Sequence, residues 1–206
     1  MRLHSSVMKS FKLVKKYISV SADFYIGIAI ASLLIPLQWL GAWLLASFVH
    51  ELCHYVALKL CKCEVLSVQI RLRGASIETE PMSLGNEAFC AYAGPIGALG
   101  VLLFARFLPR TAVCTLVLSL FNLLPVFPLD GGRGLGCILH KFLPSKVAEV
   151  IMDVLQIMVF AILSCIALYA TLGLGLGLTP VVLILFLFIK SKRIKIPCKK
   201  GLLGLQ

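Results

Sequence analysis

Long apolar runs, separated by short polar segments, dominate the chain. The first run extends from residue 24 to residue 60, and Pro36 with Gly41 offers a place to divide it into two spans. A helix that crosses a bilayer needs about 20 predominantly apolar residues. The predicted spans therefore number six, at residues 24–40, 42–60, 88–105, 112–129, 154–170 and 172–189. This pattern predicts an all-α polytopic membrane protein with six transmembrane helices.

One segment after the second predicted span follows a different period. In VLSVQIRLR, residues 65–73, apolar side chains alternate with polar ones, with Leu66, Val68, Ile70 and Leu72 on one side. Strict alternation is typical of a half-buried strand. Gly74 permits a turn, and ASIE after it could return as a second strand. We expect a small membrane-associated β-hairpin here; an ordinary amphipathic loop is the alternative.

The two ends of the chain are basic. Residues 1–20 place apolar side chains at helical spacing with lysines between them, which suits an amphipathic helix on the inner leaflet. The expected organisation is a cytoplasmic amphipathic segment (1–20), a six-span core (21–190) and a basic cytoplasmic tail (191–206).

Composition and charge agree with a membrane protein. Hydrophobic residues make up 60% of the chain and charged residues only 14%, which leaves no separate soluble domain. With six spans, 18 of the 20 Lys and Arg residues fall on one side of the membrane. Basic residues collect on the cytoplasmic side, so both termini should be cytoplasmic. Attraction to anionic lipid accounts for the net charge of +11, and no nucleic-acid partner is needed.

The sequence FVHELCHYVALKL, residues 48–60, places ionisable groups inside an apolar helix. His50 and His54 are four residues apart, so on a helix they share a face and lie about 6 Å apart along the axis. Both imidazoles can then reach one metal ion, and Glu51 beside them can contact a water at that ion. Two structural histidines with a buried glutamate are the alternative, but ionisable groups within a span are costly and usually functional.

A catalytic zinc ion takes three protein ligands and keeps a fourth position open. The best third candidate is Asp130 in FNLLPVFPLDGGRG, residues 121–134, at the inner end of the fourth predicted span. The second and fourth spans run in the same direction, so Asp130 can meet the histidines in the inner half of the bilayer. Two imidazoles and a carboxylate suit zinc, with iron or cobalt left open. A charged helix cap is the alternative for Asp130.

Asn122 is a second polar residue in the fourth predicted span. Its amide is a candidate donor to the substrate carbonyl or the developing oxyanion. An interhelical hydrogen bond is the alternative.

The order of these motifs resembles the site-2 protease family of intramembrane zinc metalloproteases. The resemblance extends from residue 24 to about residue 190, and AYAGPIG, residues 91–97, is similar to the Ala-Gly-Pro segment of that family. It implies that His50, His54 and Asp130 are zinc ligands and that Glu51 is the general acid/base. It also implies that Asn122 lies near the substrate carbonyl. The compact form is most similar to the bacterial sporulation-type branch, which implies a bacterial cell membrane.

The expected function is therefore that of a zinc-dependent intramembrane endopeptidase acting on a membrane-tethered protein. A helical substrate must unwind before its carbonyls can be attacked, and the strand at 66–72 could receive it edge-on by strand addition. The alternative is a metal-ion transporter or a metal-binding membrane protein without proteolysis, because buried carboxylates and histidines also mark ion pathways.

Overall fold

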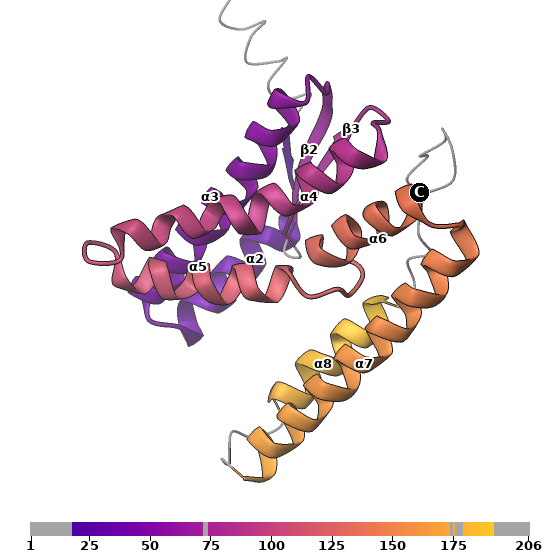
Figure 1. The fold of residues 1–206 in the computed structure, drawn as a ribbon. Helices are drawn as coiled ribbons and strands as arrows, with labels where there is room; N and C mark the ends of the chain where they lie inside the picture. Colours follow the sequence, from indigo (N-terminus) through magenta and orange to yellow (C-terminus); the bar gives the residue numbers. More distant parts are fainter. Residues whose placement is uncertain (1–17, 72–73, 174, 176–178, 192–206) are drawn as a thin grey trace, which may run out of the picture.

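A computed structural model describes residues 18–71, 74–173, 175 and 179–191. This part of the chain is mainly helical and carries one small sheet (Figure 1). Its elements in chain order are β1 (Ile18–Val20), α2 (Ala22–Leu34), α3 (Leu37–Leu60), β2 (Val65–Arg71), β3 (Gly74–Thr79), α4 (Leu84–Ala98), the 3-10 helix η1 (Leu99–Phe104), α5 (Pro109–Asn122), α6 (Asp130–Phe142), α7 (Ser145–Leu172) and α8 (Thr179–Ser191).

Each of the six predicted spans overlaps a helix, but the helices differ in length and polarity. Two of them, Leu84–Phe104 and Ser145–Leu172, are long and apolar enough to cross a membrane. Helix α3 has 24 residues, yet it does not meet the same test, because His50, Glu51 and His54 lower its mean hydropathy. Helix α5 has 14 residues and is about 21 Å long at 1.5 Å per residue, short of the roughly 30 Å hydrocarbon core. The count of six spans stays a prediction.

The structure divides the first run at Pro36, one of the two residues expected to separate the first two spans, and not at Gly41. Helix α2 ends at Leu34, and Ile35 is extended, with φ −120° and ψ 134°. A residue that precedes proline is pushed out of the helical region, so Pro36 sets this boundary. Helix α3 then starts at Leu37, four residues before Gly41.

The fourth predicted span, 112–129, is wrong in its second half. Helix α5 ends at Asn122, and residues 123–129 form an irregular loop that we call the proline loop. Pro125 and Pro128 have no N–H to donate, so the helix cannot continue through them. Asp130 is therefore not the inner end of the helix that contains Asn122. It is the first residue of a separate helix, α6, which the sequence analysis did not predict.

Helix α6 contains DGGRGLG, a composition with low helix propensity. The helix forms because its glycines allow neighbouring groups to come close. A Cβ at Gly132 would lie 2.5 Å from the carbonyl carbon of Val126, and one at Gly134 would lie 2.5 Å from the ring of Tyr92 in α4. The glycines thus let α6 pack directly on the proline loop and on α4.

The predicted β-hairpin is confirmed, and its association with the membrane stays a prediction. Strands β2 and β3 pair antiparallel, with Val68 opposite Ile77 and Ile70 opposite Ala75. A register shift between Val65 and Ser67 interrupts the alternation at its start. Leu66 is 50% exposed, whereas Val65 packs against a buried cluster.

A third strand joins this hairpin. Strand β1 pairs parallel with β2, so the strand order is β1-β2-β3. The helix predicted over residues 1–20 is therefore wrong for Ile18–Val20, and residues 1–17 lie outside the described part of the chain. Strand β2 is central and has a partner on each side, so the expectation that it receives a substrate edge-on is also wrong. The outer strands of the described sheet are β1 and β3.

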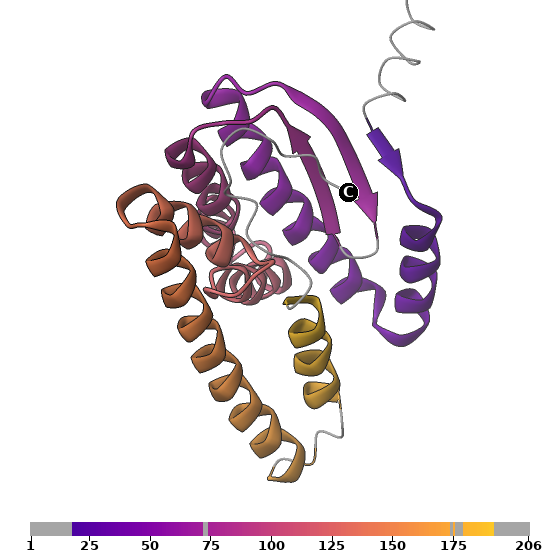
Figure 2. The ribbon, with the colours of Figure 1, turned by 90° about the vertical axis from the view of Figure 1, so that its right-hand side faces the viewer.

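Helices α3, α4 and α5 lie side by side, and the sheet lies along α3 (Figures 1 and 2). Small side chains let these helices approach closely, as Ala42 and Ala46 of α3 do against Cys114 of α5. Helices α7 and α8 form a hairpin that meets α6 and the proline loop. In this contact Phe160 and Leu187 pack on Val126, which is fully buried.

Candidate metal centre

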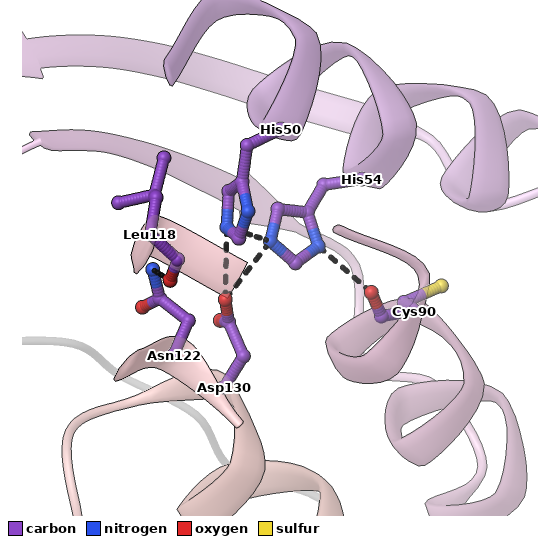
Figure 3. A network of polar contacts seen from close by, with 6 residues as sticks. All are labelled: His50, His54, Cys90, Leu118, Asn122 and Asp130. Carbon is purple, nitrogen blue, oxygen red and sulfur yellow. Dashed lines mark hydrogen bonds and ion pairs between the residues drawn. The ribbon is translucent and has the colours of Figure 1, made fainter. Parts of the chain in front are cut away.

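The two histidines of the HELCH sequence lie on one face of α3, as their spacing predicts. His50 is buried, with 4% of its surface exposed, and His54 is half-buried. Their ring centroids are 4.8 Å apart and their planes make an angle of 80°. The Nε2 atoms of the two rings are 3.1 Å apart (Figure 3). Two ring nitrogens therefore point at the same small volume.

Asp130 brings an oxygen to the same volume from the start of α6. Its Oδ2 lies 3.0 Å from Nε2 of His50 and 3.2 Å from Nε2 of His54 (Figure 3). These atoms join two elements 80 residues apart in the sequence. The structure thus brings together the three residues that the sequence analysis selected as ligands.

The ring of His54 is oriented from behind by the main chain of α4. Its Nδ1 lies 2.8 Å from the carbonyl oxygen of Cys90. A carbonyl can only accept, so Nδ1 carries the proton and donates it. The lone pair of neutral His54 then sits on Nε2, which faces Asp130. Metal-binding histidines are commonly oriented by such a hydrogen bond on the other ring nitrogen.

Close packing of α4 against α3 makes this orientation possible. A Cβ at Gly94 would overlap the imidazole of His54, and a Cβ at Gly97 would lie 2.9 Å from Sγ of Cys53. Both glycines belong to AYAGPIG. The sequence analysis noticed that segment only through its family resemblance and did not identify Cys90 or Gly94 as partners of His54. Cys90 acts through its carbonyl, which any residue type supplies, so no sequence signal marks it.

The donor set fits a divalent metal ion. The ligand atoms of His50, His54 and Asp130 all lie within 4.8 Å of one another, and this is the one such group among the described residues. In a tetrahedral zinc site with bonds of about 2.0–2.1 Å, ligand atoms are about 3.3 Å apart. The observed separations of 3.0–3.2 Å are close to that value. A cation at this point would explain why a carboxylate and a ring lone pair face each other.

Glu51 flanks the histidine pair on α3. Its side chain is half-buried. On a helix, residue 51 is turned by about 100° from residue 50. Glu51 is next to His50 in the sequence but does not belong to the group of three converging ligand atoms.

Asn122 lies at the end of α5, next to Asp130 in the view of the site (Figure 3). Its Nδ2 donates to the carbonyl of Leu118, one turn back on the same helix, at 3.0 Å. The bond that the structure records is thus neither to a second helix nor to the candidate ligands His50, His54 and Asp130. An amide nitrogen has two hydrogens, so this bond leaves one more donor on Asn122.

Two histidines four residues apart on one helix, with a glutamate after the first, are typical of the metal site of a metalloprotease. Residues 82–163 match the model of peptidase family M50. This range includes Asp130, and the histidine motif precedes it. The match supports a metalloprotease.

The structure is similar to that of the site-2 protease from Methanocaldococcus jannaschii, with a TM-score of 0.56 and 21% sequence identity. The similarity covers 90% of this chain and 94% of that one. No curated protein matches the chain. The resemblance to a site-2 protease is therefore confirmed at the level of the fold, the family match is to residues 82–163, and the sporulation-type branch stays a prediction.

Proposed function

We propose that this protein is a zinc-dependent intramembrane endopeptidase. Its substrate would be a membrane-tethered protein, cleaved within or near a transmembrane segment. The observation that carries the proposal is the convergence of Nε2 of His50, Nε2 of His54 and Oδ2 of Asp130 within 3.2 Å of one another. Glu51 follows His50 directly on the same helix. The family match to a peptidase supports the same reaction.

In this proposal His50, His54 and Asp130 hold the zinc ion, and the hydrogen bond from His54 to Cys90 keeps one ring in its ligating tautomer. When bound by these residues, zinc would supply Lewis acidity that acidifies a water and polarises the carbonyl of the scissile bond. Glu51 takes the proton from the attacking water and returns it to the leaving amine. The peptide bond is thereby replaced by a carboxyl group and an amine.

Asn122 is proposed to contact the substrate. The N–H that is not bonded to Leu118 would donate to the substrate carbonyl as negative charge develops on its oxygen. Its neighbourhood to Asp130 in Figure 3 supports this role. The existing bond to Leu118 would restrict the amide before substrate arrives.

The setting we propose is a bacterial cell membrane, crossed several times, with both termini in the cytoplasm. The two long apolar helices support a membrane protein, and the distribution of Lys and Arg supports the orientation. The lipid bilayer and a membrane-tethered substrate are then the partners. An unwound substrate segment that joined the sheet by strand addition would pair with an outer strand, such as β3, and not with the central β2.

The decisive experiment compares wild type with Glu51→Gln on a membrane-tethered test substrate and measures bound metal in both. We expect the variant to keep its metal and lose cleavage, because Glu51 is a proton acceptor and not a ligand. Glu149→Gln is the matched control, since Glu149 is an exposed carboxylate on α7, and it should cleave normally. Metal binding with no cleavage by wild type of any tethered substrate would favour the metal-binding or transport alternative.

A further inference from the structure

Gln156 is a polar side chain in α7, the more apolar of the two long candidate spans. It is half-buried, and its Oε1 accepts a hydrogen bond from the backbone N–H of Phe127 at 3.2 Å. An amide removed from water is costly unless it is bonded. This hydrogen bond offsets part of the cost of removing the Gln156 amide from water, and it joins α7 to the proline loop.

The backbone donors of the proline loop show why this contact matters. Pro125 and Pro128 have none. The N–H groups of four others are satisfied nearby: Leu123 donates to Ser119, Leu124 to Phe121, Val126 to Leu124, and Leu129 to Val126, at 2.8–3.2 Å. The fifth donor belongs to Phe127, and it goes to Gln156. Gln156 therefore supplies the acceptor that the loop cannot provide for itself.

The proline loop packs directly against the backbone at the start of α6, where Asp130 lies. Leu129, the residue before Asp130, donates to Val126 at 2.8 Å. Gly132 sits against the carbonyl group of Val126, and a Cβ at Gly131 would overlap that of Leu123. The first turn of α6 and the proline loop are thus in contact without intervening side chains. Because Phe127 is only three residues before Asp130, a shift of its backbone should also shift Asp130.

We propose that Gln156 is a positioning residue that holds Asp130 at the metal centre through its hydrogen bond to Phe127. The α7–α8 hairpin would thereby take part in setting metal affinity, although it contributes no ligand. This inference rests on the metal centre of the proposed function. It is tested by metal affinity, which does not depend on proteolysis.

Packing of α7 on the loop is the competing explanation. Phe160, one turn beyond Gln156, contacts the fully buried Val126. If packing alone positioned the loop, loss of bulk at Phe160 would disturb the site as much as loss of the hydrogen bond. The two explanations therefore predict different results for changes at these two residues.

The experiment uses the full chain in detergent and measures the Kd for Zn²⁺ by competition with a chromophoric chelator. Gln156→Met keeps the length of the side chain and removes the acceptor. Gln156→Glu keeps an acceptor oxygen at the same reach. Phe160→Leu reduces packing on the loop and leaves Gln156 intact. The visible spectrum of the Co²⁺-loaded protein reports ligand geometry in each variant.

We expect Gln156→Met to raise the Kd by about tenfold or more, as loss of an outer-shell partner commonly does, and to alter the Co²⁺ spectrum. Gln156→Glu and Phe160→Leu should stay within about threefold of wild type, well below that cost. An unchanged Kd in Gln156→Met, or equal losses in Gln156→Met and either other variant, would overturn the proposal. Should the Met variant not fold, Gln156→Asn, whose shorter side chain takes the amide out of reach, must weaken binding instead. If the wild-type chain bound no zinc, the metal centre of the proposed function would itself be refuted.

Discussion

The imidazole of His54 is bound through Nδ1 to the carbonyl oxygen of Cys90, at 2.8 Å. This contact joins α3 to α4 and fixes which nitrogen of His54 faces the candidate metal centre. It requires α4 to approach the ring closely, and Gly94 provides the space because it has no side chain. A residue of α4 thus determines how a candidate ligand on α3 is presented.

Gly94→Ala should disrupt the centre, because the added Cβ would overlap the ring of His54. Overpacking of this kind typically costs about 1–3 kcal/mol of stability. Displacement of the ring should also weaken metal binding by roughly 10- to 100-fold, the usual cost of disturbing a partner of a ligand. Thermal unfolding and a metal-binding titration measure the two effects. Gly100→Ala is the control, since a Cβ there meets nothing within 4 Å. Equal behaviour of the two variants would show that Gly94 has no special role.

Asp130→Asn tests whether the carboxylate is a ligand. The amide keeps the size of the side chain but removes its negative charge, so metal affinity should fall by more than the roughly 10- to 100-fold typical of an outer-shell change. Cleavage of a tethered substrate should fall with it. Asp153→Asn, an exposed change on α7, should leave both unchanged. A variant that retains full metal affinity would remove Asp130 from the centre.

The candidate ligands could be predicted from sequence because each gives a local signal. Helical periodicity places His50 and His54 on one face of a helix, and Asp130 is a lone carboxylate in an apolar region. The meeting of these residues followed from the direction of the second and fourth spans. That argument reached the right neighbours although it assigned Asp130 to the wrong helix.

Other features gave no local signal. Helix α6 was missed because a glycine-rich segment is typical of a loop, and it packs on Val126 in the preceding loop and on Tyr92, which is distant in sequence. The parallel pairing of β1 with β2 joins residues about 50 positions apart. The acceptors Cys90 and Gln156 act on backbone or ring atoms of other elements. Such partners depend on tertiary packing, which residue type does not reveal.

Membrane orientation can be tested with reporter fusions. An even number of spans and the placement of 18 of the 20 Lys and Arg residues predict that both termini are cytoplasmic. Alkaline phosphatase fused at either terminus should be inactive, whereas a fusion after Arg106, between η1 and α5, should be active. Green fluorescent protein fusions should give the opposite pattern. If the fusions placed one terminus outside the cell and the other inside, the number of spans would be odd and the predicted topology would be wrong.

Removal of the metal should destabilise the protein, because an ion that binds only the folded chain stabilises it in proportion to the logarithm of its concentration. At 100 times Kd this stabilisation is about 2.7 kcal/mol. Treatment with a chelator should therefore lower the Tm in detergent, and addition of Zn²⁺ should restore both the Tm and cleavage. The double variant His50→Ala/His54→Ala should show no response to either treatment, since two of the three converging atoms are gone. If its Tm still rose with Zn²⁺ as that of wild type does, the stabilising ion would be bound at some other group, and the centre on α3 and α6 would lose its role.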